Sequence, residues 1–119
     1  MAFAFEKLVV YQKSVNFADA ICQRTEGFSR GYGFLVDQLN RAALSIAANI
    51  AEGHGRESTG TFIQFLRIAQ GSLKELETHV VVSGRVGLLA DTMVSRLLNQ
   101  AEEIGRMLRS LIRSLQQKS

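Results

Sequence analysis

The sequence contains no proline and only one cysteine, Cys22. Because proline fixes φ and removes an N–H, its absence leaves glycine as the main interruption of helices. A lone cysteine cannot form an internal disulfide bond and fits a reducing compartment. No apolar run reaches the ~18 residues that cross a membrane, and the first residues do not form a signal peptide. We expect a cytoplasmic chain with no membrane contact.

The charge balance is also weak, because 14 Lys and Arg residues against 11 Asp and Glu residues give a net charge of +3. This excess is too small to indicate nucleic-acid binding by itself, although most of the cations are arginines. The 119 residues are 46% hydrophobic, as in an ordinary folded protein. We expect one domain over residues 1–119 that buries a core without disulfides or metal.

Glycine clusters divide the chain into four segments of helical length, near residues 7–26, 33–52, 58–84 and 91–116. Each segment carries apolar residues at alternating spacings of three and four, which is typical of left-handed helical packing. Short loops between long helices force neighbouring helices to run antiparallel. The sequence therefore predicts an all-α fold, an antiparallel up-down-up-down left-handed four-helix bundle.

The same spacings predict the core. We interpret Cys22 as a small buried hydrophobe because it falls on the apolar stripe of the first helix. Gly53 is expected as a left-handed C-cap of the second helix, and Ser58 and Asp91 as N-caps of the third and fourth. The expected core residues are Leu8, Tyr11, Val15, Ala18, Cys22 and Thr25 in the first helix; Val36, Leu39, Ala43, Ile46 and Ile50 in the second; Phe62, Leu66, Ala69, Leu73, Leu76 and Val80 in the third; and Val94, Leu97, Ala101, Ile104, Leu108, Leu111 and Leu115 in the fourth.

The outer sides of the second and third helices carry small and hydrogen-bonding residues, where long Lys and Glu side chains are ordinary. Gly71 lies in mid-helix, where glycine costs about 1 kcal/mol relative to alanine and usually marks a position without room for a side chain. We interpret these sides as a protein interface rather than a solvated surface. The expected interface residues are Gln38, Arg41, Ser45, Ala48, Asn49, Glu52, Arg67, Gly71 and Glu75.

Three patterns resemble chemical sites but lack their context. Residues 27–31 match the G-x-S-x-G nucleophile elbow, with an Asp and a His following, yet they join two helices and follow no strand. Residues 55–61 have the glycine spacing of a phosphate loop without its lysine. Cys22, His54 and His79 are not spaced as metal ligands. We expect no catalytic residue, no cofactor and no metal.

A basic stripe occupies the fourth helix, where Arg106, Arg109 and Arg113 fall within about 60° of one another around the axis. Glu102 is placed to pair with Arg106, and cations near a helix C-terminus are favoured by the helix dipole. A solvated face is the preferred interpretation of this stripe. Contact with nucleic-acid phosphates is the alternative.

The run R-A-x-x-S-I-x-x-N-I-A-E-G over residues 41–53, followed by residues 65–77, carries a specific resemblance. It resembles four-helix bundle proteins first noticed as reading frames in intervening sequences of 23S ribosomal RNA genes, and residues 5–14 fit the same pattern. The resemblance implies a bacterial cytosolic bundle that assembles as a ring of five, without established catalytic residues. Similar accessory variability proteins of diversity-generating retroelements bind nucleic acid through a basic surface.

These observations predict a non-enzymatic homo-oligomeric scaffold or adaptor, with itself as the main partner, a pentamer as the preferred state and weak RNA binding as a further hypothesis. The alternative is a ring that binds a small ligand or catalyses a reaction at protomer junctions. In that alternative, Arg41, Glu52 or Glu75 would supply the functional groups.

Overall fold

The computed structural model describes residues 8–118 and contains four α-helices in that range. Each described helix end lies within two residues of the expected end, whereas the expected first helical residue, at position 7, lies outside the described residues. The helices are α1 (Val9–Thr25), α2 (Gly33–His54), α3 (Thr59–Arg85) and α4 (Asp91–Lys118), with a short 3₁₀ turn, η2 (Arg30–Tyr32), before α2.

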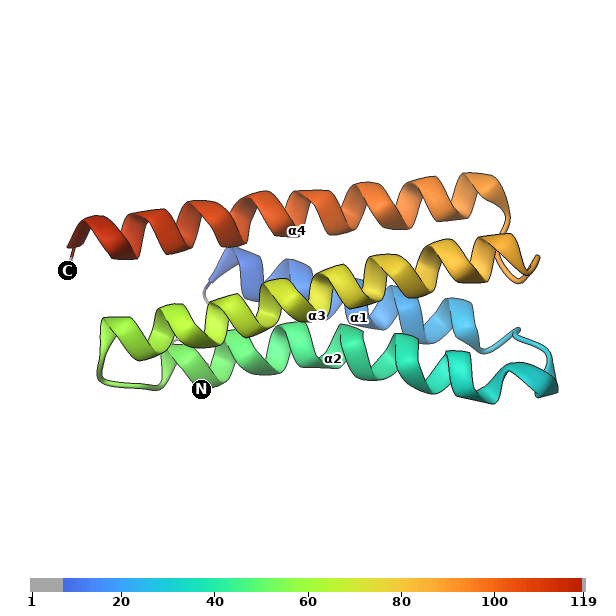
Figure 1. The fold of residues 1–119 in the computed structure, drawn as a ribbon, viewed down its shortest axis with the longest axis horizontal. Helices are drawn as coiled ribbons and strands as arrows, with labels where there is room; N and C mark the ends of the chain where they lie inside the picture. Colours follow the sequence, from blue (N-terminus) through green and yellow to red (C-terminus); the bar gives the residue numbers. More distant parts are fainter. Residues whose placement is uncertain (1–7, 119) are drawn as a thin grey trace.

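The helices lie side by side in one bundle whose extents are 46 × 27 × 20 Å. Figure 1 shows that each helix runs antiparallel to the next in the chain, and that the C-terminal end of α4 lies near the α2–α3 connection. α1 packs against α2 and α4, and α3 packs against α2 and α4. The predicted all-α, up-down-up-down bundle is therefore confirmed; its left-handed supercoil stays a prediction.

The core stripes of α2, α3 and α4 follow the predicted spacing closely, because an apolar face that repeats every 3.5 residues meets its neighbour along the whole helix. Near the end of α4 the buried residue is Ile112 rather than Leu111, as the 3.6-residue turn drifts away from that repeat. In these three helices the predicted residues that are buried are Leu39, Ala43, Ile46, Ile50, Leu66, Ala69, Leu73, Leu76, Val80, Leu97, Ala101, Ile104 and Leu108.

The predicted stripe of α1 is confirmed only in part: Ala18 and Thr25 are buried as expected, but the most buried large side chains lie one position before two of the predicted ones. Phe17 and Ile21 are buried, whereas Val15 is 41% exposed and Cys22 is exposed. The larger Phe and Ile side chains remove more apolar area from water than Val and Cys, so they determine how α1 is rotated. Ser14 enters the core with them because its hydroxyl donates a hydrogen bond of 2.7 Å to the Val10 carbonyl in the same helix.

The helix ends agree in part with the sequence. The Thr61 N–H donates to the Ser58 hydroxyl at 3.1 Å, which confirms Ser58 as the N-cap of α3. Asp91 is the first residue of α4 rather than its cap. The prediction for Gly53 is wrong, since α2 continues to His54 and Gly53 is buried inside it. Among the described residues only Gly87, after α3, has a positive φ, of 84°.

None of the helices described in residues 8–118 is long and apolar enough to cross a membrane.

Candidate functional site

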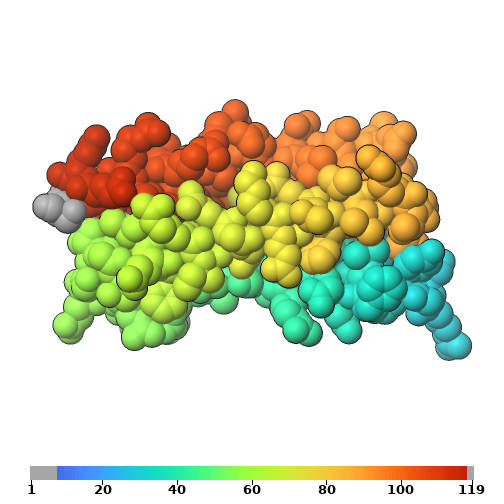
Figure 2. Space-filling view, viewed as in Figure 1, coloured from blue at the N-terminus to red at the C-terminus, as the bar shows by residue number. Residues whose placement is uncertain are grey.

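A groove of about 300 Å³ lies between α3 and α4, where arginines from both helices meet. Arg67 comes from the first half of α3, and Arg109 and Arg113 come from the second half of α4. These halves lie together because the two helices are antiparallel, and Figure 2 shows them meeting on one face. No carboxylate is among the residues that line the groove, which are Arg67, Gln70, Arg109, Ile112, Arg113 and Gln116.

The structure divides the predicted arginine stripe. Arg109 and Arg113 line this groove, whereas Arg106 is not among its lining residues. Arg106 lies close enough to Glu103, which faces α1, to act on that carboxyl: the pKa of Glu103 is lowered mainly by its hydrogen bond and charge interaction with Lys13, and further by Arg106. All three arginines are exposed.

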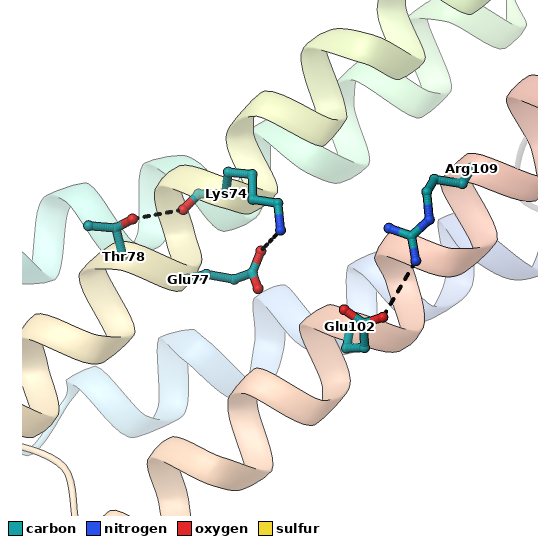
Figure 3. A network of polar contacts seen from close by, with 5 residues as sticks. All are labelled: Lys74, Glu77, Thr78, Glu102 and Arg109. Atoms are coloured by element: carbon teal, nitrogen blue, oxygen red, sulfur yellow. Dashed lines mark hydrogen bonds and ion pairs between the residues drawn. The ribbon is translucent and has the colours of Figure 1, made fainter.

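Toward the middle of α4 the groove continues into a region of mixed charge. Figure 3 shows the Arg109 guanidinium paired with Glu102 at 3.4 Å, opposite an ion pair of 3.3 Å between Lys74 and Glu77. Gly105 forms part of the lining, and a Cβ atom there would lie 3.4 Å from the Arg109 guanidinium. The groove is therefore mixed in charge at Glu102 and purely cationic at Arg113.

The predicted interface residues do not all lie on one face. Gln38 is half-buried, and Arg41, Ala48, Glu52, Gly71 and Glu75 are exposed, whereas Arg67 belongs to the α3–α4 groove. Ser45 and Asn49 already make bonds within the chain. The hydroxyls of Ser45 and Ser72 lie 2.8 Å apart and connect α2 to α3, and the Asn49 amide donates to the Ser45 hydroxyl at 3.0 Å.

Two of the acidic candidates also have partners within the chain. Glu52 forms an ion pair with Arg56 one turn later, and Glu75 lies 3.5 Å from the His79 ring.

An apolar groove lies between α1 and α2, and of its lining residues the sequence analysis assigned only Ala48 to an interface. Leu44 is 63% exposed and lines this groove of about 300 Å³ together with Tyr11, Val15, Ala18, Ala47, Ala48 and Ala51. Its signal was present in the sequence, because residues assigned to the core stripe of α1 and the alanines at positions 47, 48 and 51 of α2 together make this surface. Ile68, on α3, is also 52% exposed but is not among the residues that line this groove.

The patterns that resemble catalytic sites do not assemble into one. Ser29 precedes α2 and His54 ends it, and a helix of 22 residues separates them by about 33 Å. Within residues 8–118, no group of three or more His, Cys, Asp or Glu side chains could hold a metal ion.

Comparison with known proteins finds one family whose model matches the sequence and a solved structure with a similar fold. The model of the 23S rRNA-intervening sequence protein family matches residues 6–110. The chain belongs to this family. A solved structure from Bacteroides thetaiotaomicron VPI-5482, of a protein with unknown function from the S23 ribosomal protein family, shares 28% sequence identity with a TM-score of 0.80. The match covers 87% of this chain and 98% of that chain.

No curated protein matches the chain. The resemblance to this family found in the sequence is thus confirmed. Neither the name of the family nor that of the solved structure states an activity. Arg67, Arg106 and Arg109 lie inside the family match, whereas Arg113 and Gln116 lie beyond its last residue.

Proposed function

We propose that the protein is a non-enzymatic scaffold or adaptor that assembles into a ring of identical chains, with five as the preferred number, and binds RNA weakly through the basic stripe of Arg106, Arg109 and Arg113. The observation that supports the assembly is the exposure of large apolar side chains on and beside α2, among them Leu44 at 63% in the α1–α2 groove. A contiguous exposed apolar surface is typical of a protein interface.

In a ring, each protomer contacts its two neighbours through two different surfaces, because a head-to-tail contact joins one patch to a different patch on the next chain. The chain offers two such patches. One is the groove between α1 and α2 with Val15, Leu44 and Ala48, and the other is the outer side of α2 and α3 around Ile68 and Gly71. One patch lies between α1 and α2 and the other includes α3, and two different patches on one protomer support a closed ring over an isolated dimer.

Gly71 supports close contact with another chain. A Cβ atom at Gly71 would meet nothing within 4 Å, so packing within the described protomer gives no reason for glycine. Glycine in a helix interior nevertheless costs about 1 kcal/mol relative to alanine. A neighbouring backbone that approaches α3 at this position would account for it.

Light scattering on a sizing column tests the assembly, and the expected mass is five times that of one chain. Ala48→Arg and Gly71→Leu should lower the mass, because each places a bulky side chain in a close contact. Ser95→Arg, at an exposed position of α4, is the matched control and should leave the mass unchanged. A monomer at micromolar concentration would overturn the proposed assembly.

A further inference from the structure

We infer that the cationic end of the α3–α4 groove, formed by Arg67, Arg109 and Arg113, is a binding site for a phosphate monoester. Such a group is carried by a free nucleotide or by the 5′ end of an RNA. All the lining residues belong to one protomer, so the site does not rest on the proposed assembly. It also differs from the proposed basic stripe, because it contains Arg67 and lacks Arg106.

The first support is the concentration of positive charge. Three arginine residues from two helices line one groove of about 300 Å³, and no Asp or Glu is among the lining residues. Like charges held together repel one another, and a bound anion removes that repulsion. Among residues 8–118, no ion pair joins Arg67 or Arg113 to a carboxylate.

The second support is that the existing pairing is weak. The only described carboxylate partner of Arg109 is Glu102, at 3.4 Å between two side chains that are both about half exposed. Exposed ion pairs of this kind contribute little, so an incoming anion can displace the carboxylate. Gly105 keeps a Cβ atom out of the space beside the Arg109 guanidinium and leaves room for that side chain to move.

The chemistry of the groove favours a monoester over a diester. A phosphate monoester carries about −1.5 to −2 charges at pH 7 and offers three terminal oxygens, whereas a diester in an RNA backbone carries one charge. The planar guanidinium presents a fork of N–H donors that matches two phosphate oxygens at once. Gln70 also lines the groove, and a carboxamide can form a hydrogen bond with a sugar hydroxyl next to the phosphate.

The size of the groove limits the ligand. A volume of about 300 Å³ is at the lower end for small-molecule sites, so a phosphate with its adjoining sugar fits better than a larger cofactor.

Calorimetric titration of the full chain with adenosine 5′-monophosphate (AMP) at about 50 mM salt tests the site, with adenosine as the ligand that lacks the phosphate. AMP should bind with a Kd of about 1 mM or lower, and adenosine should not bind. AMP affinity should fall when the pH is lowered from 7.5 to 5.5, because the second phosphate pKa is about 6.

Variants then separate this groove from general basic charge. Arg67→Gln and Arg113→Gln should each weaken AMP binding by about tenfold. Arg106→Gln is the matched control on the same helix and should change it by less than about twofold. Glu102→Gln should tighten binding, because it removes the carboxylate that competes for Arg109. Far-UV circular dichroism should be the same for all four variants, which change exposed residues.

Two results would overturn the site: no difference between AMP and adenosine, or an equal loss in the Arg106→Gln and Arg67→Gln variants. A 5′-phosphorylated and a 5′-hydroxyl RNA of the same sequence identify the source of the phosphate. Tighter binding of the phosphorylated RNA assigns the groove to RNA ends, and equal binding of both RNAs assigns it to free nucleotides. A monomer that still binds AMP would overturn the ring and leave the site intact.

Discussion

Gly53 of α2 lies directly against Phe65 of α3, so that a Cβ atom at position 53 would be only 2.6 Å from the Cβ of Phe65. The same atom would lie 2.9 Å from the Phe62 ring and 3.3 Å from the Phe62 carbonyl oxygen. Because a Cβ and a backbone atom cannot rotate out of the way, the two helices can approach this closely only with glycine at position 53.

We therefore expect Gly53→Ala to lower the free energy of unfolding by about 1–3 kcal/mol, despite the better helix propensity of alanine. Gly33→Ala, at the first residue of α2, is the matched control, because a Cβ atom there meets nothing within 4 Å. It should raise the stability of the protomer by about 1 kcal/mol. Urea unfolding followed by circular dichroism measures both, and equal stabilisation by the two alanines would contradict the close approach.

The ion pair between Lys13 and Glu103, at 2.6 Å, connects α1 to α4. Lys13 holds the pKa of Glu103 below its ordinary value of 4.5. A lowered carboxyl pKa contributes stability above the unfolded value, and that contribution is lost as the pH falls through the folded pKa. The thermal midpoint of Glu103→Gln should thus lie below that of the wild type at pH 7, and the gap should close below about pH 4.5.

High salt should narrow the same gap at pH 7, because both side chains are about half exposed and the pair is screened. A difference between the two proteins that persists unchanged at pH 3 would mean that the substitution acts by a route other than charge.

Cys22 is exposed on α1, contrary to its assignment to the core. A thiol-reactive reagent should therefore modify one thiol per folded chain at neutral pH, without a denaturant. The rate should be close to that measured in urea, because no unfolding step precedes the reaction. Protection that disappears only on unfolding would show that Cys22 is covered.

RNA binding through the basic stripe predicts a steep dependence of affinity on salt. Replacing Arg106, Arg109 and Arg113 together by Gln should lower the salt slope by about 2, since each contact with a single strand contributes about 0.7. The control replaces three exposed arginines at the opposite end of the bundle, Arg24, Arg30 and Arg85, with the same loss of charge.

Filter binding at several salt concentrations gives these slopes, with circular dichroism and light scattering to show unchanged folding and assembly. The wild type should retain single-stranded RNA at about 50 mM salt. Equal slopes for the two triple variants would mean that binding depends on net charge alone.

The α1 helix shows where periodicity is insufficient. Its sequence is apolar on two sides, one with Phe17 and Ile21 and the other with Tyr11, Val15 and Cys22. Both sides satisfy a spacing of three and four, so the pattern could not state which one faces the bundle. The structure buries the bulkier side and leaves the other to form a groove with α2.

The candidate phosphate site shows a different limit. The spacing along α4 placed Arg109 and Arg113 on one arc, but it also included Arg106, which lies outside the groove. Arg67 was assigned to another surface because nothing in its local sequence relates it to α4. Its place beside Arg109 and Arg113 follows from the antiparallel packing of α3 on α4.

The sequence by itself determined the four helices, their antiparallel order, the core stripes of α2, α3 and α4, and the family motif, because each depends on local spacing along one helix or on loop length. Only the tertiary structure decided how α1 is rotated about its axis and which arginines share a groove. Those features depend on side chains far apart in the chain competing for the same buried volume, and on two helices meeting at a definite register.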